Sequence, residues 1–418
     1  MKRTALAAIG VAASVASASA TDLDVLYAAS NLMAPVHIKL AEHFQATHPG
    51  VRVNLEPALE YTDALAVTLR QSLIGQTQDA GYFGTSDVCV LAGRGIAQPL
   101  DDRIAKDPDW ASLGLPDSAL EFTKCAGKTY GIPYSASFMV VIFNDKLVAE
   151  AGGDPNHLPK TWPEILALAK KIEAASGGIA FNYDGSSSWS FMSLVQSEGG
   201  KILTDDGKDI AFESPEGLNA LQHLADIGAV RHHADMSKAQ ARQAFAAGTL
   251  GILVDSSSGL SSYKKAAAGH FEVGVVPLPV TENGRLPSSG MAGVLLTSDS
   301  KRADLAWDYV KYASSPDGQT LLGKLTGFVP FNRISIESPD KLGSYYAENP
   351  ELGVAVKALK VAGPWLSFPG PNGLKIHTTI KRYMQKVYIG AVDPTVALND
   401  MAKNTRALLK ERDVGRAP

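Results

Sequence analysis

Cysteine is scarce in this chain: Cys89 and Cys125 are the only two among 418 residues. Two cysteines that far apart do not make a zinc or iron–sulfur site by themselves. In an oxidising compartment they can form one disulfide bond, which would close a loop of about 35 residues. We favour this interpretation. The alternative is two buried thiols, because Cys89 lies in the apolar, strand-like run 88–91.

The chain also lacks a strong excess of charge: 43 acidic residues stand against 39 basic ones, and no basic run occurs. Such a mildly acidic chain is a poor nucleic-acid binder, so we expect no nucleic-acid partner. Long apolar runs are absent as well, because none after residue 20 approaches the ~18 residues that suggest a membrane helix.

Signatures of common catalytic sites are missing. The sequence has no His-Glu-x-x-His or paired Cys-x-x-Cys motif, no Gly-x-Ser-x-Gly nucleophile elbow, and no P-loop or dinucleotide fingerprint. His232 and His233 are adjacent, so their side chains tend to point apart, which indicates a solvated loop. We therefore predict no catalytic residue, no metal site and no cofactor.

One class of enzyme would leave no such signature. A secreted hydrolase with two carboxylates far apart in the sequence shows no spacing pattern, so it stays open as an alternative. The acids available to it are Glu60, Asp63, Asp87, Asp184 and Asp255.

The first twenty residues are typical of a secretory signal peptide. Lys2 and Arg3 precede an apolar stretch at 5–15, and Ala18 and Ala20 are the small residues of a cleavage site. A buried N-terminal helix is the weaker reading, because the stretch is rich in Ala, Ser and Gly. Neither cysteine is near the cleavage point, so lipid attachment is not expected. We predict cleavage after Ala20 and a mature protein free in the periplasm.

Short apolar strands alternate with amphipathic helices in the rest of the chain. The patterns predict strands at 24–27, 51–55, 87–91, 139–144, 251–255, 273–276 and 293–296, and helices at about 36–44, 63–73, from 161, 215–227, 237–247 and 303–313. This alternation predicts an α/β fold with a largely parallel sheet. A mature chain of about 398 residues suggests two lobes.

Small polar and aromatic residues gather where the predicted strands end. The clusters are 27–31, 84–87, 134–137, 186–189 and 255–259. Loops at the carboxyl ends of strands in open α/β sheets are where ligands bind. Hydroxyls and backbone N–H groups suit polar solutes, and Trp or Tyr offers a flat face. Five such clusters favour binding over catalysis.

The chain resembles the bacterial extracellular solute-binding proteins of family 1, the receptors of ABC importers. The motifs that carry the resemblance lie at 40–53, 131–145, 159–164 (Pro-Lys-Thr-Trp-Pro-Glu), 245–251 and 326–330 (Thr-Gly-Phe-Val-Pro). The resemblance implies a periplasmic-binding-protein-like fold of two α/β lobes with crossing hinge strands and a ligand cleft between them. It also implies a monomer that closes around a small solute and delivers it to membrane permease subunits. We expect residues 21–132 and 273–330 in one lobe, and 133–272 and 331–418 in the other.

Within that family the chain is most similar to receptors for glycerol-3-phosphate. The comparison implies ligand contacts at or near Tyr61, Thr85, Ser86, Ser135, Ser137, Trp189, Ser257, Ser258, Gly293, Phe328 and His377. Two positions depart from those receptors: Phe328 stands where they carry Tyr, and His377 where they carry Arg, with Lys375 and Lys381 close by. Because His is a weaker and pH-dependent substitute for Arg in binding phosphate, we expect the solute to be either a phosphorylated polyol, such as a glycerophosphodiester, or a neutral sugar.

The departure at His377 carries a testable expectation. If its imidazole binds phosphate as a cation, His377→Ala weakens a phosphate ligand more at pH 6 than at pH 8. The alternative is a solvated helix residue with no role in binding.

Overall fold

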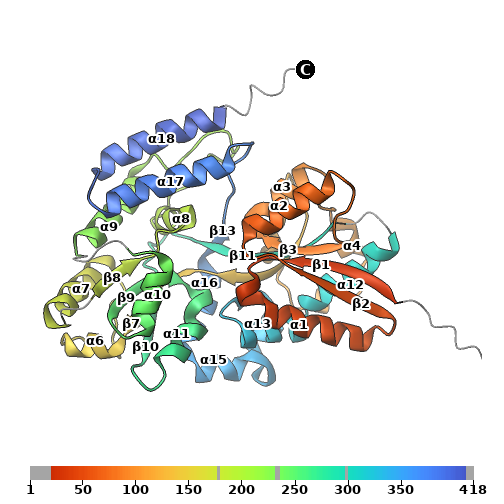
Figure 1. Ribbon diagram of the computed structural model, residues 1–418, viewed down its shortest axis with the longest axis horizontal. Helices are drawn as coiled ribbons and strands as arrows, with labels where there is room; N and C mark the ends of the chain where they lie inside the picture. Colours follow the sequence, from red (N-terminus) through yellow and green to blue (C-terminus); the bar gives the residue numbers. More distant parts are fainter. Residues whose placement is uncertain (1–19, 177–178, 231–235, 297–299, 411–418) are drawn as a thin grey trace, which may run out of the picture.

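The computed structural model describes residues 20–176, 179–230, 236–296 and 300–410. The predicted signal peptide, apart from Ala20, and the pair His232–His233 lie outside the described residues. The described chain forms two α/β lobes side by side, each with its own sheet, and strands run from one lobe into the other (Figure 1).

The larger sheet belongs to the first lobe and has seven strands in the order β12-β6-β11-β3-β1-β2, with β13 paired to β11. Its strands are β1 (Thr21–Tyr27), β2 (Val51–Pro57), β3 (Ala80–Gly84), β6 (Ile132–Ser137), β11 (Leu286–Leu295), β12 (Val329–Pro330) and β13 (Ala362–Pro364). Strands β1, β2 and β3 are parallel, whereas β11 is antiparallel to both β3 and β6. The sheet is therefore mixed, not largely parallel as predicted.

The second lobe contains a four-stranded sheet in the order β10-β7-β9-β8. Its strands are β7 (Met139–Asn144), β8 (Ile179–Tyr183), β9 (Leu250–Ser256) and β10 (Val273–Pro277), and a separate small hairpin joins β4 (Lys124–Cys125) to β5 (Lys128–Thr129). Strand β10 pairs antiparallel with β7, so the strand predicted at 273–276 belongs to this second sheet. An apolar pattern predicts a strand but not its neighbour.

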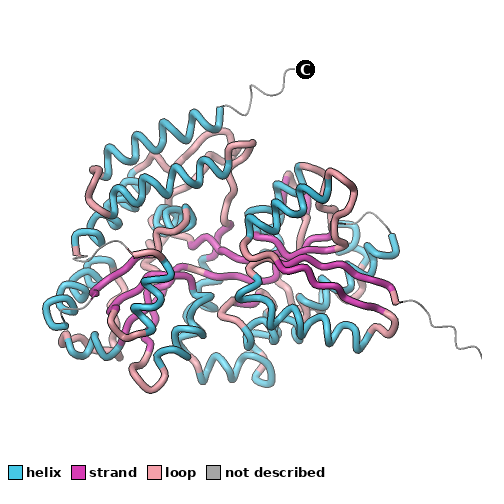
Figure 2. The backbone as a smooth tube through the Cα atoms, in the orientation of Figure 1, coloured by secondary structure: helices cyan, strands magenta, loops and turns pink. Residues whose placement is uncertain are grey.

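Helices cover both sheets, as the tube in Figure 2 shows. They are α1 (Ser30–Thr47), α2 (Tyr61–Ser72), α3 (Val88–Gly93), α4 (Asp101–Lys106), α5 (Asp117–Leu120), α6 (Asp145–Glu150), α7 (Trp162–Ser176), α8 (Ser188–Ser197), α9 (Pro215–Ala229), α10 (Lys238–Ala246), α11 (Leu260–Ala267), α12 (Ser300–Ala313), α13 (Pro316–Leu325), α14 (Arg333–Glu337), α15 (Ser344–Glu348), α16 (Pro350–Ala358), α17 (Gly373–Tyr388) and α18 (Pro394–Lys410). Each lobe has its own apolar core, and a smaller cluster lies beneath α10 and α11.

The predicted strand at 87–91 is wrong: these residues belong to a short 3-10 turn and to α3, and the third strand of the sheet is Ala80–Gly84. The run Ala-Gly-Tyr-Phe-Gly is buried at every position, so it shows no alternation that would identify it. A short apolar run such as 88–91 fits a strand and a buried helical turn equally well.

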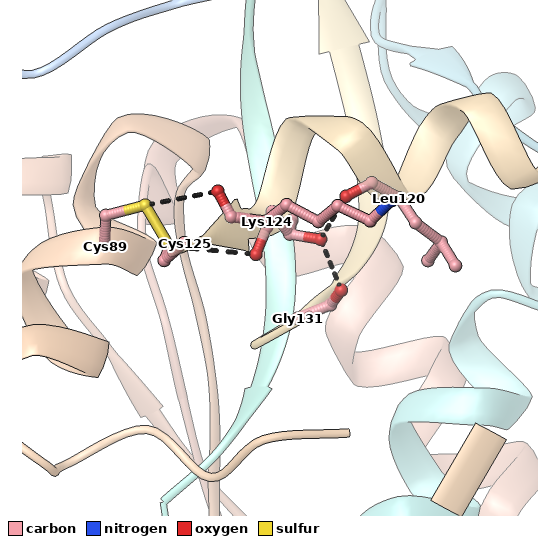
Figure 3. The surroundings of a disulfide bond; sticks show 6 residues. Cys89, Leu120, Lys124, Cys125 and Gly131 are labelled. Carbon is pink, nitrogen blue, oxygen red and sulfur yellow. Dashed lines mark hydrogen bonds between the residues drawn. A yellow bond between two sulfur atoms is a disulfide. The ribbon is translucent and has the colours of Figure 1, made fainter. Parts of the chain in front are cut away.

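A disulfide bond joins Cys89 in α3 to Cys125 in the β4–β5 hairpin, with their Cα atoms 5.4 Å apart (Figure 3). This confirms the bridge over the alternative of two free thiols. Beside it, the buried hydroxyl of Thr123 donates to the carbonyl of Gly131, 2.7 Å away. The hairpin is thereby tied both to α3 and to the segment that leads into β6.

The first crossing from one lobe to the other takes a single residue, Phe138, which separates β6 from β7. Its N–H donates to Ser257 Oγ at 3.1 Å, and its carbonyl accepts from the Ser257 N–H at 2.8 Å. The chain crosses again between β10 and β11. The strands therefore change sheets at Phe138 and between Pro277 and Leu286, while the full lobe ranges expected from sequence stay a prediction.

Candidate functional site

Three aromatic side chains from separate segments meet where the lobes join. Tyr61 begins α2, Trp189 lies in the first turn of α8, and Trp365 follows β13. The Trp365 ring lies 6.4 Å from the Tyr61 ring and 6.5 Å from the Trp189 ring, centre to centre, at interplanar angles of 75° and 54°. We call these three residues the aromatic cluster. Rings at such angles offer several faces to one solute.

Hydrogen bonding distinguishes the two indoles. Trp189 Nε1 donates to the carbonyl of Pro287 at 2.9 Å, which fixes this ring against β11. Trp365 Nε1 is buried and has no hydrogen-bond partner among the described residues. Because a buried donor without a partner is costly, the Trp365 N–H is a natural contact for a bound acceptor.

On the first-lobe side, Asp87 lies against Tyr61. A Cβ atom at Gly84 would lie 3.1 Å from Asp87 Oδ2 and 3.4 Å from Tyr61 Cδ1, so the missing side chain at Gly84 lets these groups approach. Burial raises the pKa of Asp87 to about 7, and a hydrogen bond from Ser86 opposes the shift. Burial, with the charge of Asp87, also raises the pKa of the Tyr61 hydroxyl, which hydrogen-bonds to Ser289. The aromatic cluster is thus bordered by Asp87, a carboxyl whose pKa lies near neutrality.

On the second-lobe side, Ser188 pairs with His377. Ser188 Oγ lies 2.5 Å from His377 Nδ1, and the imidazole packs edge-on against Phe368 with ring centres 5.3 Å apart. Burial lowers the pKa of His377 to about 4. Without a ligand the imidazole is therefore mostly neutral at pH 6 and at pH 8, and the cation expected at this position would form only if a bound phosphate raised this pKa. The sequence gives no sign of the enclosure by Phe368 and Ser188 that lowers the pKa.

Two of the serines predicted as ligand contacts bind the β6–β11 pair together. Ser137 Oγ donates to the carbonyl of Ser289 at 2.7 Å, and Ser135 Oγ accepts from the Met291 N–H at 3.1 Å. Both serines are buried. Their hydroxyls hold the strand that presents Ser289 to Tyr61, so their effect on the cluster runs through the backbone.

The other two serines stand at the crossover. Ser257 Oγ accepts from the Phe138 N–H, as described above, and Ser258 Oγ lies 2.8 Å from Ser256 Oγ. These contacts close the turn after β9 and anchor it to the strand that links the lobes. Such hydroxyls position the junction between lobes.

The remaining predicted residues divide into two kinds. Ser86 contacts Asp87, and Thr85 Oγ1 is buried with no hydrogen-bond partner among the described residues. Gly293 faces the first-lobe core, since a Cβ there would lie 2.6 Å from Val310 Cγ1. Phe328 is buried in the same core, only 4% exposed. The structure therefore places Ser86 against Asp87 and leaves Gly293 and Phe328 in packing positions.

Trp365 was missed at the sequence level. Ser188 and Asp87 lie in the polar clusters 186–189 and 84–87 but were not among the individual residues expected to contact the ligand. The signal available for Trp365 was an aromatic residue in a loop rich in Pro and Gly, at 363–373. Such loops carry binding residues more often than buried strands do.

The acids considered for a hydrolase are engaged in other contacts and do not form a free pair beside the aromatic cluster. Glu60 and Asp63 form the capping box of α2. Asp184 and Asp255 both contact Lys238, at 2.5 and 3.3 Å, and Arg242 also contacts Asp255, at 2.8 Å, so two cations balance the two carboxylates. Asp87 and Glu60 both act on the pKa of Tyr61 in the aromatic cluster, but Glu60 is engaged in the capping box, so these acids do not supply the free pair of carboxylates that glycoside hydrolysis requires.

Neither a cluster of metal-binding side chains nor a membrane-spanning helix occurs in the part of the chain that the structure describes. No group of three or more His, Cys, Asp and Glu side chains there is arranged to hold a metal ion. No helix in the same residues is long and apolar enough to cross a membrane.

The arrangement of the lobes is that of periplasmic solute receptors. The chain superposes with a TM-score of 0.80 on UgpB from Mycobacterium tuberculosis in complex with glycerophosphocholine (19% identity, covering 94% of this chain and 99% of that one). It superposes with a TM-score of 0.78 on the cyclic alpha-maltosyl-1,6-maltose binding protein from Arthrobacter globiformis (23% identity, 94% and 100% coverage). At these identities the likeness establishes the fold.

The family follows from the sequence. The family model described as bacterial extracellular solute-binding protein matches residues 39–353, so the chain belongs to that family. A binding protein of Brucella abortus (strain 2308) is 26% identical over 97% of this chain and 98% of its own length. The sn-glycerol-3-phosphate-binding periplasmic protein UgpB of Agrobacterium fabrum is 25% identical over 69% of each chain.

Membership confirms the expected family and the two-lobed fold. The protein is a solute-binding receptor and not an enzyme, so the hydrolase alternative is set aside. The relatives are named for different solutes, some for a glycerophosphate and others for oligosaccharides.

Proposed function

We propose that this protein is the periplasmic receptor of an ABC importer and that it binds a glycerophosphodiester, with glycerophosphocholine as the first candidate. A single observation carries the proposal: Tyr61, Trp189 and Trp365 meet at the junction of the lobes with Asp87 beside them. Aromatic faces with a nearby carboxylate suit a quaternary ammonium group, which cation–π attraction holds at about 0.5–2 kcal/mol.

The proposed site is smaller than the set expected from sequence. It retains Tyr61, Thr85, Ser86, Trp189 and His377 as ligand-facing residues, and it adds Asp87, Ser188 and Trp365. The serines Ser135, Ser137, Ser257 and Ser258 act by holding the strands on which the site is built. Delivery to membrane permease subunits by a monomeric receptor completes the proposed role, and signal cleavage after Ala20 would release it into the periplasm.

A neutral carbohydrate is the second candidate. The aromatic cluster supports it equally, because flat rings stack on the apolar faces of sugars. The neutral imidazole of His377 also removes one cation that would have favoured phosphate. The charge on Asp87 separates the two candidates, since a sugar hydroxyl contacts a protonated or an ionised carboxyl, whereas choline favours the ionised form.

Isothermal titration calorimetry of the mature protein, freed of ligand by unfolding and refolding, tests the proposal. The panel contains glycerol-3-phosphate, glycerophosphocholine, glucose and maltose. We expect one glycerophosphocholine per chain, and at about 100 times Kd a stabilisation of roughly 2.7 kcal/mol. Trp365→Ala should weaken binding at least tenfold. Trp110→Ala is the matched control, because Trp110 stacks on Trp307 in the first lobe. Binding of maltose alone would replace the proposed solute, and binding of no panel member would contradict the proposal.

A further inference from the structure

A cavity of about 350 Å³ lies in the second lobe, where β8 ends and α17 passes it. Its described lining includes Asn182 at the end of β8, Ser186 in the loop that follows, Lys238 at the start of α10, and Lys381 and Gln385 on α17. This volume is at the lower end of the range for small-molecule pockets, about 300–1,000 Å³.

Two short stretches of chain connect the Ser188–His377 pair to residues that line this cavity. Lys381 follows His377 by four residues on α17, so the two side chains lie on one face of the helix, about 6 Å apart along its axis. Ser186 precedes Ser188 by two residues in the same loop. A solute that contacts the aromatic cluster and passes His377 would therefore meet Lys381 about one helical turn further along α17.

Hydrogen-bonding capacity in the cavity is available to a ligand. Asn182 is only 3% exposed, and its Oδ1 atom has no hydrogen-bond partner among the described residues. A buried amide oxygen in this state is costly unless a donor reaches it. The hydroxyl groups of a polyol are suitable donors.

The charges around the cavity leave one cation uncompensated. Lys238 is held by Asp184 at 2.5 Å and by Asp255 at 3.3 Å, so its charge is already balanced. Lys381 is exposed and forms no ion pair with any residue that the structure describes. An anionic group in the cavity would meet its ammonium without displacing an existing partner.

We propose that this cavity is the second half of the binding site and takes the phosphate-bearing polyol portion of the solute. Lys381 contacts the phosphate, and the Asn182 amide accepts from a polyol hydroxyl. The other end of the solute lies against the aromatic cluster. The solute is thus a two-part molecule that spans both regions. This inference rests on the proposed function and specifies which end of the solute lies where.

A lysine pair on α17 provides the test. Lys375 and Lys381 are both exposed on the same helix, but Lys381 alone of the two lines the cavity. We expect Lys381→Met to raise the Kd for glycerol-3-phosphate and glycerophosphocholine at least tenfold and to leave the Kd for maltose within twofold. Lys375→Met should leave all three unchanged. Both substitutions are at exposed positions, so thermal unfolding should match the wild type.

Methyl NMR locates the bound group independently. Met384 lines the cavity and is buried, whereas Met33 lies in the core of the first lobe. With methionine methyls labelled with carbon-13, glycerol-3-phosphate should shift the Met384 signal and leave that of Met33 unchanged.

The outcomes separate the inference from the proposed function. Equal affinity of Lys381→Met and wild type for both phosphate esters, with Trp365→Ala still impaired, would overturn the cavity assignment and leave the receptor proposal intact. A wild-type protein that binds maltose and no phosphate ester would overturn both the assignment and the glycerophosphodiester. A Met384 signal that does not shift at saturating glycerol-3-phosphate would also contradict binding of the phosphate ester in the cavity.

Discussion

The indole of Trp189 in the second lobe donates a hydrogen bond to the carbonyl of Pro287, 2.9 Å away in strand β11 of the first-lobe sheet. The contact crosses the junction between the lobes beside the aromatic cluster. It gives this ring one orientation, which preorganises a face of the site before solute arrives.

Two substitutions of Trp189 should distinguish the contribution of its aromatic ring to solute binding from that of its hydrogen bond to Pro287. Trp189→Ala is expected to weaken solute binding by about 1–3 kcal/mol through lost apolar contact. Trp189→Phe keeps an aromatic face and loses the bond to Pro287, so its loss should be about 1 kcal/mol. Calorimetric Kd values of both variants test this. Equal affinity of Trp189→Ala and wild type would place Trp189 outside the site.

Asp87 should make binding of a cationic headgroup dependent on pH. Its pKa of about 7 means that the carboxyl is mostly protonated at pH 6 and mostly ionised at pH 8. We expect the affinity for glycerophosphocholine to fall by up to about tenfold from pH 8 to pH 6, because the cation loses its counter-charge. Asp87→Asn should bind weakly and with no such slope.

The same carboxyl affects stability in a defined direction. Its pKa in the folded state lies above the value of an unfolded Asp, so the folded state binds more protons between about pH 4 and 7, and stability falls as pH rises through that window. Asp87→Asn should therefore be more stable than the wild type at pH 8 and gain little at pH 4. Urea unfolding at both pH values measures the free energy of unfolding of the variant and the wild type. A difference between them that does not depend on pH would contradict the raised pKa of Asp87.

We expect the contribution of His377 to solute binding to be independent of pH between 6 and 8, in contrast to the expectation from sequence. Since burial lowers its pKa to about 4, the imidazole is neutral at both pH 6 and pH 8. His377→Ala should weaken binding equally at these two pH values. An NMR titration of the imidazole gives the pKa directly, and a midpoint above 6 would restore the charged role.

Lys238 should be important for stability. It bridges Asp184 and Asp255, and Arg242 Nε contacts the same Asp255 carboxylate at 2.8 Å. Lys238→Met leaves buried carboxylates short of a partner, so we expect a loss of about 3–5 kcal/mol in the free energy of unfolding. Lys208→Met is the control. Lys208 pairs with Asp206 at the surface, at 3.5 Å, and its removal should cost under about 1 kcal/mol. Equal losses in the two variants would show that Lys238 stabilises the fold no more than a surface ion pair does.

Sequence reasoning reached the class of fold and the family because both depend on patterns spread along the chain. Alternating strands and helices survive errors in single elements, such as the helix α3 that was taken for a strand. The disulfide was also accessible, since only one pairing of Cys89 and Cys125 exists.

The site was less accessible because it depends on which segments meet in space. Trp365, Tyr61 and Trp189 are separated by more than a hundred residues each, and no spacing rule connects them. The serines at 135, 137 and 257 have the composition of ligand contacts, but their hydroxyls are used by neighbouring backbone. The pKa of His377 depends on burial by Phe368, which composition does not reveal.

The crossover at Phe138 restricts how the lobes can move. One residue separates β6 from β7, and two backbone-directed hydrogen bonds to Ser257 hold it on both sides. Because Ser257 lies in the turn after β9, these bonds fix Phe138 to the second lobe, so a change in the angle between the lobes at this crossing falls on the backbone of β6. Trp189 and Tyr61 lie in different lobes, so the separation of their rings would change with that angle.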